Sequence, residues 1–298
     1  MKDTYPKESM ENLCGLFGNS RIAWYKKQKT IYKQAVEEQI VLERVRRVKK
    51  RMPRIGARKL HEILRQDSIE LGRDKLFEIL GRNGLLVRRR RTRVVTTQSF
   101  HWLRKYPNLI REMHVNRPNQ LWVSDITYVT TTEGFMYLFL ITDAYSKMIM
   151  GYKLSENLKA TNGVLALKNA LSSQLTKVSD LIHHSDRGIQ YCSDEYVSIL
   201  KRKKIRISMT ENGDPLENAI AERVNGILKD EWLYDMGPLE KGKMEETISR
   251  VIKIYNTERP HLSLDMLTPK VAHLGSGELK RRWKNYYRPK PKEDAEIT

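Results

Sequence analysis

The chain has 298 residues, 40% of them hydrophobic, and its 55 Lys and Arg outnumber its 36 Asp and Glu, for a formal net charge of +19. This length allows one sizeable core with one or two small modules, and no apolar run approaches the roughly 20 residues that span a bilayer. The lack of an apolar signal segment and the presence of only two cysteines, Cys14 and Cys192, predict a cytoplasmic protein with neither a disulfide framework nor a four-cysteine zinc site.

The basic residues are concentrated in the first third of the chain. Residues 1–112 contain 28 Lys and Arg against 12 Asp and Glu, a net charge of +16, whereas residues 113–298 contain 27 and 24, a net charge of +3. Such a division predicts a polyanion-binding region joined to a domain of another kind. Nucleic acid is the favoured polyanion, because the basic segments lack the amphipathic helix with a large aromatic face that a membrane surface requires.

The first predicted module covers residues 1–35. Residues 8–29 have the pattern of two short helices around a turn at Gly18 and Asn19, with Ser20 capping the second helix. Two helices joined in this way resemble a helix-turn-helix, although the pattern alone is common. In that arrangement the second helix presents these basic residues to DNA: Arg21, Lys26 and Lys27.

The second predicted module covers residues 36–95 and is helical and strongly basic. One helix runs to a stop at Pro53, and a helical pair follows over residues 56–67 and 72–86. A charge run of one sign beside a compact helical pair favours phosphate contacts, which fix position without reading sequence. Residues 96–112 are interpreted as a linker. The predicted DNA-contacting residues of the module are Arg46, Arg47, Lys49, Lys50, Arg51, Arg58, Arg88, Arg89, Arg90, Arg91 and Arg93.

The residue pattern changes after the linker, and residues 113–275 are predicted to form an α/β domain. Residues 119–131, 134–146 and 147–156 are three β-rich runs separated by short turns, which is the pattern of an antiparallel meander. After them strands and helices alternate. This order predicts a mixed sheet with helices on both faces. Residues 276–298 are expected to form a basic, frayed tail.

Three acidic residues of this domain lie at positions where a carboxylate is unusual or points to a function. Asp125 lies in the middle of an apolar strand, and Asp186 ends a second strand at the edge where open α/β sheets bind ligands. Glu222 lies on a later helix, with Lys229 seven residues on and on the same side. Each acid alone would be interpreted as a helix cap or a surface ion pair. If the fold brings all three together, their mutual repulsion favours a bound cation, and hard oxygen ligands select magnesium or manganese.

Four segments of this domain resemble the catalytic core of transposases of the insertion sequence three (IS-three) family, which belongs to the retroviral-integrase superfamily. They read WVSDITY, HHSDRGIQY, NGDPLENAIAERVNGILKDEW and YNTERPHLSLDMLTP, with 35 residues between the second Asp and the Glu. The resemblance implies a ribonuclease-H-like integrase core, in which a mixed five-stranded sheet is flanked by helices. It also implies that all-α helix-turn-helix modules for DNA binding precede the core.

The same resemblance implies roles for individual residues. Asp125, Asp186 and Glu222 would form the metal-binding catalytic triad and hold two Mg²⁺ ions, for which Mn²⁺ would substitute. Lys229 would contact the transposon-end DNA near the active site. Further residues match family positions that would support the site without taking part in the chemistry: Tyr128, His184, Asn218 and His261.

No zinc is expected, although retroviral integrases carry an upstream module of two His and two Cys. The first third of this chain offers only Cys14, His61 and His101, at unsuitable spacings. His183 and His184 lie beside Asp186 and are expected to shape its loop rather than bind metal.

The activity that the resemblance implies is that of a DNA transposase, which would cleave the 3′ ends of an insertion sequence and transfer them to another phosphodiester, by a copy-out, paste-in route. Its expected partners are double-stranded DNA, as terminal inverted repeats and as target, and further copies of the chain in a homodimer or higher oligomer. The chain begins where the downstream (OrfB-type) reading frame of the family would begin, so an upstream-frame protein or fusion segment is a further expected partner. The expected location is the bacterial cytoplasm, at the nucleoid.

Two alternatives remain open from the residues. A regulator of transposition could use the basic modules to bind DNA and retain a catalytically silent core, which the intact triad disfavours. A ribonuclease-H-like nuclease could use the same carboxylates to cut DNA without joining it.

Overall fold

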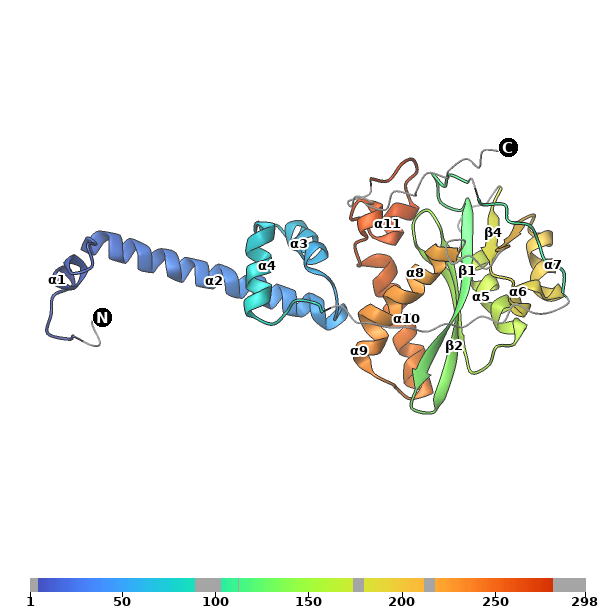
Figure 1. Ribbon diagram of the computed structural model, residues 1–298, viewed down its shortest axis with the longest axis horizontal. Coiled ribbons are helices and arrows are strands. Elements are labelled where there is room, and N and C mark those ends of the chain that lie inside the picture. Colours follow the sequence, from blue (N-terminus) through green and yellow to red (C-terminus); the bar gives the residue numbers. More distant parts are fainter. Residues whose placement is uncertain (1–4, 89–102, 112, 174–179, 212–217, 281–298) are drawn as a thin grey trace, which may run out of the picture.

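The computed structural model describes residues 5–88, 103–111, 113–173, 180–211 and 218–280. An extended helical part leads into an α/β body, with the first helices at one end of the molecule and the sheet toward the other (Figure 1). Among the described helices, none combines the length and the apolar character that crossing a membrane requires.

The helical part is built around one long helix, α2. The Ser20 side chain starts this helix by accepting a hydrogen bond of 3.1 Å from the backbone N–H of Ala23. Apolar side chains three and four residues apart on the second half of α2 pack against α3 and α4, whereas the first half extends away from them and is mostly exposed (Figure 1). The described helices of this part are α1 (Met10–Gly15), α2 (Arg21–Arg51), α3 (Ala57–Gln66) and α4 (Arg73–Arg82).

A mixed sheet of five strands, in the order β3-β2-β1-β4-β5, forms the centre of the α/β body. The first three strands pair antiparallel as the meander pattern predicted, whereas β4 runs parallel to β1 and β5 runs parallel to β4. The strands are β1 (Leu121–Thr131), β2 (Gly134–Asp143), β3 (Ile149–Ser155), β4 (Ile182–Ser185) and β5 (Arg206–Met209).

Helices cover both faces of this sheet. Successive strand residues point to opposite faces, so Phe139 and Ile141 pack toward α5, α6 and α7, while Leu138 and Leu140 pack toward α8 and α10. This is the ribonuclease-H-like arrangement predicted from the motifs. The elements that follow the meander are α5 (Ala160–Ser172), α6 (Ile189–Cys192), α7 (Asp194–Arg202), α8 (Ala219–Leu228), the π-helix η2 (Lys229–Leu233), α9 (Tyr234–Met236), α10 (Lys241–Thr257), the 3-10 helix η3 (Leu262–Leu264) and α11 (Pro269–His273).

The helical part packs directly on the α/β body. Trp232 of η2 is fully buried, and its indole Nε1 donates a 2.7 Å hydrogen bond to the carbonyl of Arg51 at the end of α2. Lys59 of α3 pairs with Glu231 at 2.9 Å. Buried apolar side chains of both parts belong to one continuous core. The polar and apolar contacts together make a packed joint between the basic helices and the sheet.

The structure departs from the expected elements at α2. The helix runs unbroken from Arg21 to Arg51 because it contains neither Gly nor Pro, so the expected module boundary between residues 35 and 36 falls inside it. The short helix α6 after Asp186 was not expected. Residues 212–217, which precede α8, lie outside the described residues, as do residues 281–298 of the tail.

Candidate active site

Neighbouring strands bring Asp125 and Asp186 together. β1 and β4 run parallel with Val123 opposite His184. Asp125 lies two residues beyond this pair on β1, and Asp186 directly follows the last residue of β4. The charge of Asp186 acts on Asp125, so the two carboxylates lie near each other at the carboxyl end of β4.

The surroundings of Asp125 favour its neutral form. Burial and the charge of Asp186 raise the pKa of Asp125 to about 7, and the charge of Glu222 raises it further in the same direction. Two donors oppose this shift: the Ile126 backbone N–H bonds to Oδ1 at 2.9 Å, and Asn225 Nδ2 bonds to Oδ2 at 2.7 Å. Asp186 and Glu222 thus repel the charged form of Asp125, and a cation bound between the carboxylates would relieve this repulsion.

Glu222 reaches this place from the first turn of α8, where it is exposed. The helix is fixed over the sheet by a buried apolar stripe and by Asn218, whose Nδ2 donates a 3.2 Å hydrogen bond to the carbonyl of Ser124. Asn218 thus ties the start of α8 to the residue before Asp125. A supporting role for Asn218 is what the family resemblance implied.

Asn225 is a site residue that the sequence analysis did not single out. It lies three residues after Glu222, so both side chains project from the same side of α8. Its hydrogen bond to Asp125 orients the carboxylate that lies most deeply in the site. The three-residue spacing was the available signal, but it did not distinguish Asn225 from a solvated surface residue.

Lys229 begins η2 and is half-buried. Burial lowers its pKa, whereas the charge of Asp125 raises it, so the ammonium group lies within the field of that carboxylate. A π-turn of this kind is frequent at functional sites. The π-helix η2 contains both Lys229, which lies near Asp125, and Trp232, which is buried against the helical part.

The histidine pair before Asp186 forms part of the buried sheet. His184 Nδ1 lies 2.8 Å from Ser208 Oγ on β5, and His183 Nε2 lies 2.7 Å from Ser124 Oγ on β1. Burial and the neighbouring His184 lower the pKa of His183 to about 3, so its ring is neutral. Both rings join adjacent strands through hydroxyl groups.

Two of the expected supporting residues lie away from the carboxylates. Tyr128 is three residues from Asp125 on the regular strand β1, so its ring projects from the other face of the sheet, where it packs against Tyr137. His261 follows α10 and packs edge-on against Tyr255, with ring centroids 5.1 Å apart. It lines a cleft on a different side of α8 from Glu222.

The predicted DNA-contacting residues are described in part. Most are exposed on the helical part: Arg21, Lys26, Lys27, Arg46, Arg47, Lys50, Arg51, Arg58 and Arg88. Lys49 is half-buried and donates to the carbonyl of Pro53 at 3.2 Å, so it supports the end of α2. Arg51 also pairs with Glu258 of the α/β body at 2.5 Å. Four of the predicted residues lie outside the described residues: Arg89, Arg90, Arg91 and Arg93.

The three carboxylates face one region without forming a closed ligand shell. Within the described part of the chain, no three His, Cys, Asp or Glu side chains lie close enough to hold one metal ion in their present positions. Asp186 Oδ1 accepts the backbone N–H of Gly188 at 3.0 Å. Glu222 is the exposed member of the set, so it is the side chain with room to move toward the other two.

Comparison with known proteins gives consistent matches. Two models described as integrase core domain match residues 115–215 and 203–269. A 31 kDa protein of insertion element IS600 from Shigella sonnei is 35% identical over 86% of this chain and 96% of its own length. The transposase of insertion sequence element IS629 from the same organism is 32% identical over 68% of both chains. Transposase InsF of insertion sequence IS3A from Escherichia coli is 29% identical over 88% of this chain and 92% of its own.

Solved structures of viral integrases also match. The catalytic core domain of HTLV-2 integrase, solved in complex with magnesium, is 19% identical over 53% of this chain and 97% of its own, with a TM-score of 0.42. A simian T-cell lymphotropic virus intasome in complex with a PP2A regulatory subunit is 18% identical over 79% of each chain, with a TM-score of 0.48.

Proposed function

The chain belongs to the insertion sequence three (IS-three) family of transposases with an integrase core, and from this premise we propose that it cleaves the 3′ ends of its insertion sequence and joins them to other DNA. The observation that carries the proposal is that Asp125 on β1 lies within the electrostatic influence of both Asp186, directly after β4, and Glu222 on α8. These carboxylates are separated by 60 and 35 intervening residues in the sequence.

The donor set fits a pair of hard divalent cations. All three candidates are carboxylates, and Asp186 and Glu222 both raise the pKa of Asp125, so a nearby cation would offset their repulsion. Asp125 and Asp186 would hold the ions from the strands, and Glu222 would complete the set from α8. Magnesium bound at these residues, or manganese in its place, would supply activation of the attacking oxygen and stabilisation of the leaving oxygen.

The remaining residues of the site orient these groups and the substrate. Asn225 holds the Asp125 carboxylate in one orientation, and Asn218 fixes the start of α8 against β1. Lys229 would contact a phosphate of the terminal DNA, because its ammonium group lies beside the carboxylates and is only half-buried. The exposed basic residues of the helical part would bind the flanking duplex through its backbone.

In the proposed reaction water attacks the phosphodiester at the element end and releases a 3′-hydroxyl. That hydroxyl then attacks a second phosphodiester, so one bond forms as another breaks and the protein is not covalently modified. Joining two ends would require at least two copies of the chain on the DNA. The copy-out, paste-in route and an upstream-frame partner are further parts of the proposal that rest on the family alone.

The test is incubation of the purified chain with duplex DNA carrying the terminal inverted repeats, in Mg²⁺ or Mn²⁺, with cleaved and joined products scored on one gel. Glu222→Gln should bind the DNA as the wild type does and form neither product. Glu195→Gln, an exposed carboxylate on α7, is the matched control and should retain both activities. Cleavage without joining would favour the nuclease, and full transposition in cells by Glu222→Gln would favour the regulator.

A further inference from the structure

A large cleft lies on the side of α8 that faces away from Asp125. It has a volume of about 1030 Å³ and is lined by α8, by the end of α10 and the segment after it, by the turn after β2, and by Lys59 of α3. Ile220, Arg223 and Val224 face this cleft, whereas Glu222 and Asn225 project from another side of the same helix. None of the triad residues lines it.

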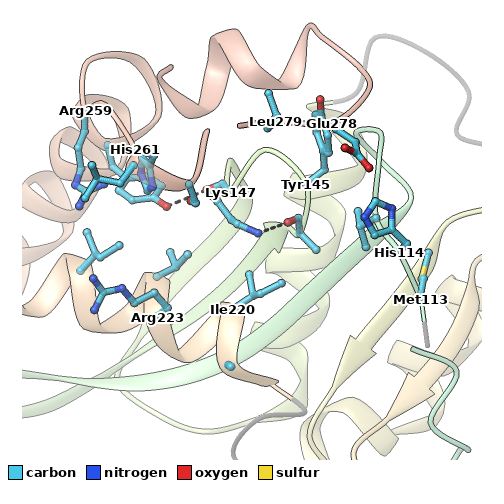
Figure 2. A pocket seen from close by; sticks show the side chains of 18 of the residues that line it. Met113, His114, Tyr145, Lys147, Ile220, Arg223, Arg259, His261, Glu278 and Leu279 are labelled. Atoms are coloured by element: carbon cyan, nitrogen blue, oxygen red, sulfur yellow. Dashed lines mark hydrogen bonds between the residues drawn. The ribbon is translucent and has the colours of Figure 1, made fainter. Parts of the chain in front are cut away.

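Among the described residues that line the cleft, four side chains are cationic and one is acidic. The cations are Lys59, Lys147, Arg223 and Arg259, and the acid is Glu278. Arg223 and Arg259 lie toward one end with His261, whereas Glu278 lies toward the other end beside Tyr145 (Figure 2). The cleft is therefore polarised, with its positive charge gathered at the end formed by α8 and the segment after α10.

Within the described part of the chain, Glu231 neutralises part of this positive charge. Glu231 accepts two hydrogen bonds from the Arg259 guanidinium, at 2.6 and 2.7 Å, and a third from Lys59 at 2.9 Å. One carboxylate thus serves two cations. Arg223 is exposed, and within the described residues it makes neither a hydrogen bond nor an ion pair. Lys147 donates to the carbonyl of Ala144 at the mouth of the turn after β2.

A buried polar atom at the same end of the cleft also lacks a partner. His261 is 5% exposed, and its Nε2 has no hydrogen-bond partner among the described residues. Burial lowers the pKa of His261 well below its usual value, and Arg259, Lys59, Lys147 and Arg223 lower it further, so the neutral ring stands among four cations. The Nε2 atom is therefore available to form a hydrogen bond with a polar group bound in the cleft.

We propose that this cleft is a second DNA-contact site, in which Arg223, Lys147 and His261 bind the phosphodiester backbone of the strand that the carboxylates cut. The inference rests on the proposed function, because it takes DNA as the substrate. Phosphate oxygens accept hydrogen bonds and carry the charge that the cleft lacks. Its volume lies at the upper end of small-molecule sites, so it has room for more than one phosphate group.

The position of Arg223 favours a DNA strand over a free anion as the ligand of the cleft. Arg223 directly follows Glu222, and consecutive helical residues project about 100° apart. A phosphodiester at Glu222 therefore places neighbouring phosphates of the same strand, which are spaced by about 3.4 Å along the duplex axis, within reach of the next side chain. The strand would run over the start of α8 and into the cleft.

The experiment measures the affinity of the full chain for end-containing duplex DNA by fluorescence anisotropy over a salt series. Arg223→Ala should lower the affinity and reduce the slope of log K against log salt by about 1, as expected for one lost phosphate contact. Arg223→Lys should restore most of the slope, and Arg223→Glu should weaken binding more than Arg223→Ala. The matched control is Arg250→Glu on the exposed side of α10, which should behave as the wild type.

Two further arms identify the source of the phosphate and separate the two proposals. Inorganic phosphate and a mononucleotide should compete with DNA only at millimolar concentration. The DNA assignment would be overturned in favour of a small-anion site if either of them binds tightly, and if Arg223→Ala abolishes that binding but leaves DNA affinity unchanged. If Arg223→Glu matches Arg250→Glu while the wild type binds and cleaves end DNA, only the cleft proposal fails. If the wild type neither binds nor cleaves end DNA, the proposed function fails with it.

Discussion

The side-chain amide of Asn225 donates a 2.7 Å hydrogen bond to Oδ2 of Asp125, although the two residues are 100 positions apart in the chain. The bond joins the helix that carries Glu222 to the strand that carries Asp125. It also favours the charged form of a carboxylate whose pKa is otherwise raised by burial and by Asp186. Asn225 is therefore positioned to set both the orientation and the protonation of the central acid.

Replacing Asn225 with Ala should lower the rate of metal-dependent cleavage about 10- to 100-fold, the usual cost of losing a partner that orients a metal-binding group. The pKa of Asp125 should rise when this donor is lost, so activity should recover in part at higher pH or higher Mg²⁺ concentration. Cleavage rates over a grid of pH and Mg²⁺ concentration would measure the effect, with DNA affinity expected to stay unchanged.

Asn169→Ala is the control for this change, because Asn169 also donates its amide, to the carbonyl of Tyr152 on β3, at an exposed site on the other face of the sheet. It should leave the rate and its pH profile as in the wild type. A uniform loss of activity in Asn225→Ala, with no shift in the pH profile, would contradict a role through Asp125.

Gly151 on β3 should be intolerant of any side chain. A Cβ there would lie 2.4 Å from both the carbonyl oxygen of Ala166 and the backbone nitrogen of Ala170 on α5. Gly151→Ala should therefore lower the free energy of unfolding by about 1–3 kcal/mol or more, since backbone atoms must move. Gly226→Ala, in open space inside α8, should instead raise it by about 0.5–1 kcal/mol. Urea unfolding of the two variants provides the comparison, and equal effects would disprove the close packing of β3 on α5.

Asp125 and Asp186 could be selected from the sequence because each stands in or directly after a short apolar run, where a carboxylate is unusual, and because the family motif groups them with Glu222. Whether the fold brings them together was a hypothesis that the sequence could not decide. The positions of the Asn225 and Tyr128 side chains were harder to predict, for two different reasons. The contact of Asn225 depends on how α8 is rotated over β1, which no local pattern specifies. Tyr128 matches a family position, but the two-residue period of a regular strand sends its side chain to the face opposite Asp125.

The rest of the arrangement depends on contacts between distant segments. The joint between Trp232 and Arg51 links the helical part to the sheet through residues 181 positions apart, and it places the basic helices relative to the carboxylates. The segment after α10 folds back so that Arg259 meets Glu231, which carries His261 into the cleft beside α8. Of these residues, the family resemblance had singled out His261, but it did not specify which side of α8 the ring would reach.

Lys229 should contribute one phosphate contact to DNA binding. Its ammonium group is half-buried beside Asp125, so Lys229→Ala should weaken binding of end DNA and reduce the slope of log K against log salt by about 1. Lys168→Ala removes the same charge from an exposed position on α5, on the other side of the sheet, and should change neither quantity. Anisotropy titrations over a salt series measure both, and a wild-type slope in Lys229→Ala would exclude the contact.

The ion cluster of Glu231, Arg259 and Lys59 should make folding sensitive to acid. Although burial opposes it, the charges and hydrogen bonds of Arg259 and Lys59 lower the pKa of Glu231 to about 2, below its ordinary value of 4.5. The folded state therefore holds this proton more weakly than the unfolded state. The stabilisation is fully present above pH 4.5 and is lost as the pH falls toward 2.

Glu231→Gln should lower the free energy of unfolding by about 3–5 kcal/mol near pH 7, because it leaves two buried cations without their partner. Its deficit relative to the wild type should shrink as the pH falls from 5 toward 3, since the wild type then loses the same interaction by protonation. Glu258→Gln removes the ion pair with Arg51, which is more exposed than the pairs of Glu231, and should cost at most about 1 kcal/mol. Urea unfolding at several pH values would show the convergence, and a deficit that stays constant with pH would mean that the cost comes from packing rather than from charge.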